Sequence, residues 1–516
     1  MSLRLNAFWL GSMAVAIGVC LHLPMFLEAR SMNYILAGMP MDDMMLTGMA
    51  LIVAGTLLAG YGLMPGSPIA DVPNWEAIAS GAVERSDTER LTPAHWSLMA
   101  TLTIALVIDV MKPASLGFVV PGMAKEYGLS RPAVAILPFF ALTGTMLGSY
   151  LWGVAADLLG RRAAILLAAI MFIGTAICGA MPSFAWNVVM CFLMGLSAGG
   201  MLPVAYTLLA ETVPAKHRGW LLVMLGGVSL AGGYLAASGC AVFLEPIFGW
   251  RIMWFLGLPT GLLLIVLNKF IPESPGFLLL HGRTAEARRI LARFQVPLPV
   301  ARISRPPAPQ ALVSSHRSRM LFGHPFAGTT ASLTAAALAW GLVNFGLILW
   351  LPTDLRAEGY SVASSDRLLA QSTLLALPTA ALTAWLYAAW STKRTLILLS
   401  VLTAIGLCSV SLLGRVLPAT GVLPVALITL LMIGSNGIIA VLLPYSAESY
   451  PVQLRGKGTG VVAGTTKLGG VIAQIISMTA LVPALTMAAS ALAIPVIASA
   501  IMLGRYGIET KNRRLD

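Results

Sequence analysis

The feature that most constrains this chain is a series of long apolar runs separated by short polar loops. A helix of about 20 apolar residues crosses a hydrocarbon core of roughly 30 Å, and only helices or closed barrels satisfy the backbone's hydrogen bonds there. Hydrophobic residues make up 58% of the 516 residues and charged residues 10%, too little polar surface for globular cores in water. The sequence therefore predicts an all-α membrane protein in a lipid bilayer, with about 14 spans.

The runs fall into groups separated by two polar segments. The predicted parts are two spans in residues 1–64, a cytosolic linker over 65–95, six spans in 96–271, a basic segment over 272–325, six spans in 326–504 and a tail over 505–516. The N-terminal run is followed by a second span and by no clear cleavage site, so we interpret it as a retained helix.

The segment 272–325 determines the expected orientation. It holds eight arginines against the acids Glu273 and Glu286, and short loops rich in Lys and Arg stay in the cytosol. An even number of spans on each side then places both termini in the cytosol, as expected in a bacterial inner membrane. The same retention accounts for the net charge of +12, so we expect no nucleic-acid partner.

Motifs for catalysis or metal binding are missing from the sequence. There is no Walker A element, nucleotide loop, zinc pattern or nucleophile elbow, so we expect neither an enzyme nor a primary pump, and no cofactor. Five cysteines lie singly in apolar runs without metal-ligand spacing, which predicts no disulfide and no metal site. They are Cys20, Cys178, Cys191, Cys240 and Cys408.

An internal repeat links the two six-span groups. Residues 210–219 match residues 447–456, so that Glu211 and Arg218 correspond to Glu448 and Arg455. The register continues into the next helix, where a set of glycines aligns: Gly227, Gly232 and Gly233 with Gly464, Gly469 and Gly470. The repeat predicts two related halves with a substrate site between them.

The turn Gly153-Val-Ala-Ala-Asp157-Leu-Leu-Gly160-Arg161-Arg162 resembles the signature loop of the major facilitator superfamily. Further segments are similar to its sugar porter, organic ion (SLC22-like) and aromatic acid:proton symporter branches: Gly117–Pro121, Phe192–Gly200, Pro272–Pro275, Trp350–Pro352 and Glu509–Lys511. The resemblance covers about residues 96–514. It implies the major facilitator fold, two six-helix pseudo-repeats. It leaves out the two additional N-terminal helices, for which we predict no role beyond packing or assembly.

Opposite charges at cytosolic helix ends predict a gate that holds the inner side shut. The alternative is that the arginines only follow topology and the acids cap helices. The counterpart of the signature loop, Trp390-Ser-Thr-Lys393-Arg394, lacks its Asp and glycines, so we expect an asymmetric gate. The predicted gate residues are Gly153, Asp157, Gly160, Arg161, Arg162, Glu211, Arg218, Glu448 and Arg455.

Asp109 and Lys112 lie three residues apart on one face of the first core helix, deep in the membrane. We predict that they take part in proton coupling; a permanent ion pair is an equal alternative. Aromatic acid symporters carry an Asp-Gly-x-Asp element here, and Lys112 stands in place of the second acid. The branch's arginine at the head of the fourth helix is replaced by Cys191, which excludes coupling through that arginine.

Lys467 lies about 15 Å into the eleventh core helix, near the bilayer midplane. A lone cation there attracts a carboxylate or sulfonate. Organic anion carriers often have an arginine at the matching place, ahead of a Gly-Gly pair. The predicted substrate-binding residues are Lys467, Asn344, Asn436, Gln371, Trp340 and Tyr206, although ordinary interhelical packing is as good an interpretation for all but Lys467.

Taken together, these features predict a secondary active transporter that moves a small organic anion, a carboxylate with aromatic acids among the candidates, by alternating access with proton-coupled symport. One alternative is a proton-driven exporter of a drug-like or metal-chelating metabolite. Another is a non-transporting membrane sensor or assembly factor. The intact loop around Asp157 favours a transporter.

Overall fold

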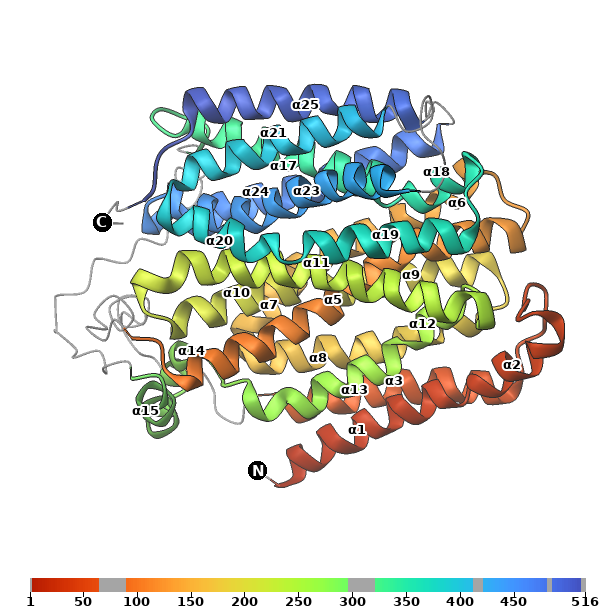
Figure 1. The fold of residues 1–516 in the computed structure, drawn as a ribbon. Helices are drawn as coiled ribbons and strands as arrows, with labels where there is room; N and C mark the ends of the chain where they lie inside the picture. The colour runs from red at the N-terminus through yellow and green to blue at the C-terminus, as the bar shows by residue number, and fades with distance from the viewer. Residues whose placement is uncertain (1, 65–89, 296–320, 412–420, 480–484, 512–516) are drawn as a thin grey trace. The chain divides into compact units, whose positions relative to one another are not determined.

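The structure is a computed structural model that describes residues 2–64, 90–295, 321–411, 421–479 and 485–511 (Figure 1). Within these ranges, 14 helical stretches are long and apolar enough to cross a membrane, which confirms the predicted number. Residues 65–89 of the predicted linker and residues 296–320 of the arginine-rich segment lie outside the described residues.

The helices follow one another through short connections. Their bounds are α1 Ser2–Cys20, α2 Leu23–Glu28, α3 Asp43–Leu63, α5 Pro93–Glu126, α6 Arg131–Val134, α7 Ile136–Leu159, α8 Arg161–Gly174, α9 Phe184–Ala198, α10 Met201–Thr212, α11 Ala215–Phe248, α12 Ile252–Phe255, α13 Gly257–Leu267, α14 Pro275–Leu280, α15 Thr284–Arg293, α17 Ala327–Val343, α18 Leu351–Ala357, α19 Val362–Ala376, α20 Thr379–Ala389, α21 Thr392–Val410, α23 Val422–Ser449, α24 Val452–Met478 and α25 Leu485–Tyr506. Short 3-10 segments cover Ala29–Met32, Thr175–Ala180 and Asn268–Phe270, and a π-helical turn, η4, covers Asn344–Ile348.

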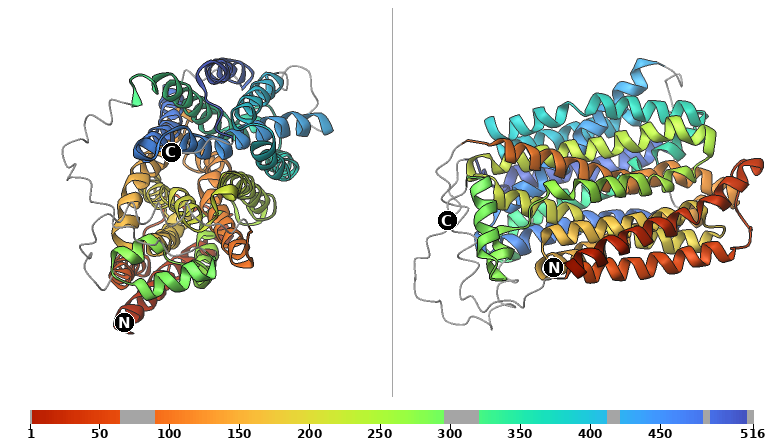
Figure 2. Two further views of the ribbon diagram at one scale, coloured as in Figure 1. Left: turned by 90° about the vertical axis from the view of Figure 1, so that its left-hand side faces the viewer. Right: turned by 90° about the horizontal axis from the view of Figure 1, so that it is seen from below.

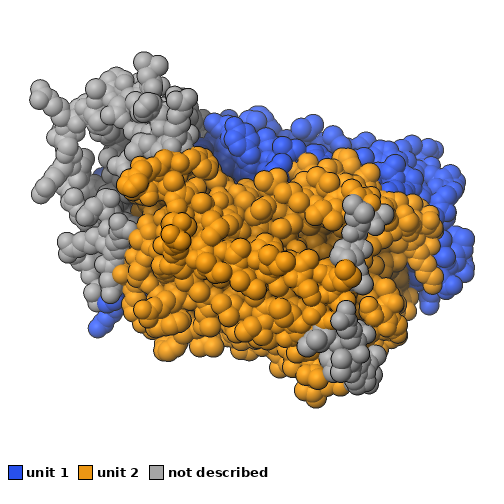
Figure 3. All heavy atoms as spheres, turned by 90° about the horizontal axis from the view of Figure 1, so that it is seen from above, with its two compact units in different colours: residues 1–109, 144–218, 251–309 blue, residues 110–143, 219–250, 310–516 orange. Residues whose placement is uncertain are grey.

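The chain forms two compact units (Figure 3). The first comprises residues 1–109, 144–218 and 251–309, and the second comprises 110–143, 219–250 and 310–516. Helices α5, α7 and α11 each run from one unit into the other. The division into halves over 96–271 and 326–504 therefore stays a prediction.

In the first unit, the additional helices α1 and α3 lie side by side (Figure 2). A Cβ atom on Gly18 would lie 2.6 Å from the carbonyl oxygen of Gly48, and one on Gly48 would lie 2.6 Å from that of Gly18. Only glycine allows two helices to approach so closely. The Asp42 side chain caps α3 by accepting a 2.8 Å hydrogen bond from the Met45 amide, so the start of the second helix is fixed by sequence.

The pair α1 and α3 packs against α8 in the same unit. A Cβ atom on Gly174 would lie 2.8 Å from Ile52, which shows how closely α3 approaches α8. In the span Arg161–Ala180, 89% of the apolar window is buried. The helix that follows the signature turn is therefore enclosed by protein.

In the second unit, α17 packs closely on α24. A Cβ atom on Gly469 would lie 2.5 Å from the Leu338 carbonyl oxygen, and one on Gly341 would clash with the Thr466 carbonyl. The π-helical turn η4 follows α17 directly. Single π turns within helices are frequent at functional sites, and this one lies against the helix that carries Lys467.

Candidate functional site

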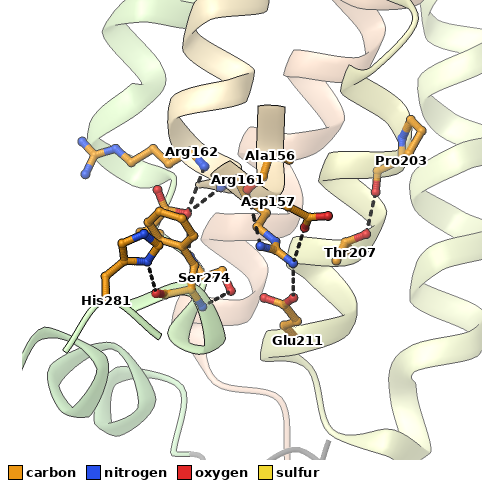
Figure 4. Close-up of polar contacts among 11 residues, drawn as sticks. Ala156, Asp157, Arg161, Arg162, Pro203, Thr207, Glu211, Ser274 and His281 are labelled. Carbon is orange, nitrogen blue, oxygen red and sulfur yellow. Dashed lines mark hydrogen bonds and ion pairs between the residues drawn. The ribbon is translucent and has the colours of Figure 1, made fainter. Parts of the chain in front are cut away.

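The signature turn joins α7 to α8 at a glycine in the left-handed region. Gly160 has a φ of 104°, which L side chains rarely adopt, and a Cβ atom there would clash with the Glu273 carboxylate. Next to it, an Arg161 guanidinium nitrogen lies 3.4 Å from Asp157 and 3.5 Å from Glu211 (Figure 4). The structure thus brings together three of the predicted gate residues, from α7, α8 and α10.

Glu273 caps the N-terminus of α8. Its Oε1 accepts hydrogen bonds from the backbone amides of Arg161 at 2.7 Å, Arg162 at 3.2 Å and Ser274 at 2.9 Å. Burial raises the pKa of Glu273, while these hydrogen bonds act in the opposite direction. The Pro272–Pro275 segment therefore holds the end of the signature turn in place.

The remaining predicted gate residues of the first unit have different surroundings. The Arg162 Nε donates to Asn268 Oδ1 at 2.6 Å. Gly153 is exposed, and a Cβ atom there would meet no atom within 4 Å, so packing does not explain this glycine. Arg218 lies in the first turn of α11, and Arg455, in the second unit, in the first turn of α24.

The counterpart turn in the second unit is held by a carboxylate from the C-terminal segment. Glu509 accepts hydrogen bonds from the Thr392 hydroxyl at 2.6 Å, the Thr392 amide at 3.1 Å and the Ser391 hydroxyl. Burial opposes the charge, but these hydrogen bonds lower the pKa of Glu509 below its ordinary value. The Lys393 ammonium donates to the Gly504 carbonyl at 2.8 Å.

Glu448, the repeat counterpart of Glu211, accepts different hydrogen bonds. The Tyr387 hydroxyl donates to it at 2.6 Å and the Thr510 hydroxyl at 2.7 Å. A Cβ atom on Gly219 would lie 2.7 Å from Glu448 Oε1, so the start of α11 closely approaches this carboxylate. Glu211 and Glu448 thus occupy matching sequence positions in unlike environments.

A second set of ion pairs, which we name the Arg131 cluster, comprises Arg131, Glu245, Asp354, Arg356 and Asp366, all in the second unit. Arg131 pairs with Asp354. Arg356 lies 3.4 Å from Glu245 and 3.2 Å from Asp366.

The sequence alone does not reveal this cluster, because 223 residues separate Arg131 from Asp354. Arg131 precedes α7, whereas Asp157 lies in its last turn, so the cluster belongs to the opposite end of that helix from the signature turn. Burial raises the pKa of Asp354, and the charge of Arg131 opposes this shift.

Lys467 lies over an aromatic ring of η4. Its ammonium nitrogen is 5.4 Å from the centre of the Phe345 ring, which in turn lies 5.7 Å from Trp340 in an edge-to-face arrangement. The Gln474 side chain, two turns further along α24, donates to the Phe345 carbonyl at 2.6 Å. The predicted cation therefore borders the π turn directly, in a geometry typical of cation–π contacts.

Gln474 also connects η4 to the Arg131 cluster. It accepts a 3.1 Å hydrogen bond from the Trp350 indole, and the Arg131 guanidinium lies 4.7 Å from the centre of the Trp350 indole. A continuous series of contacts thus runs from Lys467 to Arg131 within the second unit.

The two predicted asparagines lie on different elements of the second unit, Asn344 at the start of η4 and Asn436 on α23. Asn344 is 2% exposed and accepts a 3.2 Å hydrogen bond from the Tyr234 hydroxyl. Asn436 is 6% exposed, and neither atom of its amide has a hydrogen-bond partner among the described residues. The Trp340 indole donates to the Ser435 carbonyl at 2.8 Å, which places this ring against α23.

A void of about 10 Å³ lies near these groups, space for roughly one water molecule. It is lined by Ala114, Gly117, Phe118, Tyr234, Ser238, Ile348, Leu349, Pro352, Leu369, Thr373 and Met432. In the state described here, this void is too small for an organic acid.

The other candidates are distributed over both units. Tyr206 is half-buried on α10 in the first unit, and Gln371 is exposed on α19, away from the void. Asp109 and Lys112 are 6% and 1% exposed on consecutive turns of α5. Cys191 is buried on α9.

Comparison with known proteins gives consistent matches. Residues 125–516 match the family described as "Sugar (and other) transporter". The chain is 29% identical to the niacin transporter NiaP of Acinetobacter baylyi, covering 76% of this chain and 89% of that protein. It is 28% identical to the 4-hydroxybenzoate transporter PcaK of the same organism, covering 80% and 91%.

The fold matches that of solved major facilitator structures. The proton:xylose symporter XylE bound to 6-bromo-6-deoxy-D-glucose superposes with a TM-score of 0.62 at 19% identity, covering 82% of this chain and 97% of that one. With 14 apolar helices and this fold, the chain is an integral membrane protein. The family match covers well over half of its length, so the chain belongs to the sugar (and other) transporter family of the major facilitator superfamily and is a transporter rather than an enzyme.

Proposed function

We propose that this transporter moves a small organic acid, a carboxylate with an aromatic ring, across a bacterial inner membrane. The observation that carries the proposal is the position of Lys467, a half-buried cation over the Phe345 ring beside the π turn. The relatives transport niacin and 4-hydroxybenzoate, which supports the same substrate class here.

The groups around Lys467 suit such a substrate. A carboxylate attracts the ammonium group far more strongly in a low-dielectric interior than in water. The rings of Phe345 and Trp340 offer edges and faces for a planar ring, which is favourable for aromatic stacking. Asn344 lies in the same π turn as Phe345 and adds a polar contact.

We expect transport by alternating access, with the signature turn on the cytosolic side. Helix α7 has 24 residues and is about 36 Å long, enough to cross a bilayer, so we expect Arg131 before its start and Arg161 after its end to lie on opposite sides of the membrane. Each set of ion pairs would hold one side shut, and each must break once in a transport cycle. Both termini are then cytosolic.

Proton coupling is assigned to Asp109, with Lys112 as its neighbour on the next turn. An ionisable group this deeply buried in a membrane helix is costly unless it has a task. Protonation of Asp109 would remove one negative charge from the protein interior as the substrate anion brings one in. The net charge of the interior would then change little.

The test is uptake of labelled benzoate, nicotinate and 4-hydroxybenzoate into proteoliposomes, with and without an inward proton gradient. Wild-type protein should accumulate at least one acid, and Lys467→Ala should reduce uptake at least about tenfold, because the attraction of this half-buried cation for the carboxylate is lost. Lys269→Ala, which removes an exposed lysine after α13, is the matched control.

Equal uptake by wild type and Lys467→Ala would contradict the anion site. Uptake that does not respond to the gradient would contradict the role of Asp109.

A further inference from the structure

The amide of Asn436 is an unusual polar group in the interior of the second unit. It is 6% exposed, and within the described residues neither its Nδ2 nor its Oδ1 takes part in a hydrogen bond. Buried side-chain amides are almost always hydrogen-bonded, since each unmet donor or acceptor is unfavourable in an apolar interior. An amide with both groups unused points to a partner from outside the chain.

The position of Asn436 on α23 indicates where this partner would lie. Residues four apart share one face of a helix, so Met432 and Ala440 lie on either side of Asn436. Met432 lines the void together with Tyr234 of α11, and a Cβ atom on Gly227 of α11 would lie 3.5 Å from Ala440. Asn436 therefore lies on the face of α23 that is turned toward α11, between the void and the contact of Gly227 with Ala440.

The same turn of α23 borders the aromatic rings beside Lys467. Ser435, the preceding residue, accepts the hydrogen bond from the Trp340 indole, and Trp340 packs against the ring under Lys467. A ligand held by its carboxylate at Lys467 and stacked on these rings would extend toward α23. Asn436 is the next residue of α23, so its unused amide lies one position along the chain from the group that contacts these rings.

We propose that Asn436 determines substrate specificity by pairing with a hydroxyl substituent on the ring of the transported acid. This inference rests on the proposed function, because it takes Lys467 as the site of the carboxylate. The Asn436 side chain has an NH₂ group that donates hydrogen bonds and a carbonyl oxygen that accepts them. A phenolic hydroxyl can accept from the NH₂ group or donate to the carbonyl oxygen. A methyl group of similar size forms no hydrogen bond with the Asn436 amide and leaves it unpaired. The site therefore discriminates against the methyl-substituted acid.

The test compares three pairs of ring-substituted benzoates, hydroxy against methyl at the 2, 3 and 4 positions, as competitors for uptake in proteoliposomes. For at least one pair, the wild type should prefer the hydroxy acid by about tenfold or more, because a buried amide is satisfied only by that acid. Asn436→Leu should reduce this preference to about threefold or less, measured as the ratio of competition by the hydroxy and methyl acids within the same variant. Ser446→Ala should keep the wild-type preference, because the Ser446 hydroxyl donates to the Leu443 carbonyl of its own helix and, among the described residues, to no other group.

A second measurement separates recognition from a structural role. Removing an unpaired buried amide should leave the thermal stability of the ligand-free protein unchanged or raise it, in Asn436→Leu and in the smaller Asn436→Ala. A clear fall in both variants would show that the amide is bonded inside the protein and would overturn the inference.

The remaining outcomes are also decisive. If the wild type takes up benzoate but shows no hydroxy preference, or if Asn436→Leu keeps the preference, the inference fails and the anion site stands. If the wild type takes up none of these acids, the proposed function fails and the inference fails with it.

Discussion

Glu273 and Glu509 perform the same structural task in the two units, although their sequence contexts are unlike. Each follows the last helix of its repeat. Each accepts a hydrogen bond from the backbone amide of the first residue of a helix, Arg161 of α8 for Glu273 and Thr392 of α21 for Glu509. The duplicated fold thus retains a carboxylate cap where the signature turn itself has diverged. The two caps differ in electrostatics, since burial raises the pKa of Glu273 whereas hydrogen bonds lower that of Glu509.

Replacing the capping carboxylates of Glu273 and Glu509 by neutral amides should have unequal effects on the free energy of unfolding at pH 7. A lowered pKa means that Glu509 stabilises the fold above its ordinary pKa of 4.5 and loses this effect as the pH falls through the lower folded value. Glu509→Gln should therefore reduce the free energy of unfolding by roughly 1 kcal/mol, a typical value for a helix cap. Thermal unfolding in detergent measures this.

Glu273→Gln is the matched comparison. Its raised pKa means that its stabilising effect is present below 4.5 and is lost as the pH rises through the folded value, so little remains at pH 7. The amide oxygen of Gln can still accept from Arg161, and we expect an unchanged or higher unfolding temperature. A larger loss for Glu273→Gln than for Glu509→Gln would contradict this assignment.

The Arg131–Asp354 ion pair should weaken in mild acid. The pair requires the ionised carboxylate, and burial raises the pKa of Asp354 with Glu358 contributing in the same direction and Arg131 opposing. Protonation therefore begins above the ordinary value of 3.8. Spin labels at Lys125→Cys and Ala357→Cys, both exposed in the second unit, should report longer distances as the pH falls, in a background without native cysteines.

Asp354→Asn provides the control for this pH response. With no carboxylate to titrate, the label distances should stay long at every pH. A pH response that persists in Asp354→Asn would assign the titration to another group.

Gln474→Leu should loosen the Arg131 cluster from a distance. The side chain bonds to both the Phe345 carbonyl and the Trp350 indole, and Trp350 lies beneath Arg131. Without it, the same two spin labels should show a broader distance distribution, and the rate of uptake should fall by about threefold or more, as for other coupled contact networks. Ser477→Ala, which bonds only to the Ala473 carbonyl on the same helix, should leave both measurements unchanged.

The packing of the two additional helices should fail when a side chain is added at their contact. Gly48→Val places a branched side chain against the Gly18 carbonyl and His22, and overpacking of this kind is unfavourable by about 1–3 kcal/mol. Gly504→Ala on α25 is the control, because a Cβ atom there meets nothing within 4 Å. The unfolding temperature should fall for Gly48→Val alone; an equal fall in both variants would argue against close α1–α3 packing.

The sequence predicts the number of spans because length and hydropathy alone decide whether a helix crosses a bilayer. It also predicts the contact of Arg161 with Asp157, which lie four residues apart. The Arg131 cluster requires the tertiary fold, since its members come from four separate parts of the chain. The unpaired state of Asn436 could not be predicted either, because hydrogen-bond satisfaction depends on every neighbouring side chain.

The enclosure of α8 by α1 and α3 has a consequence for how the protein responds to bilayer thickness. A helix that meets lipid must match its apolar length to the hydrocarbon, and mismatch produces tilt or local deformation. Because α8 is almost wholly covered, this stress falls on the additional helices and reaches the Arg161 contacts only indirectly. Uptake should therefore depend weakly on acyl-chain length in phosphatidylcholine vesicles, and a steep dependence would show that the additional helices transmit the stress to the gate.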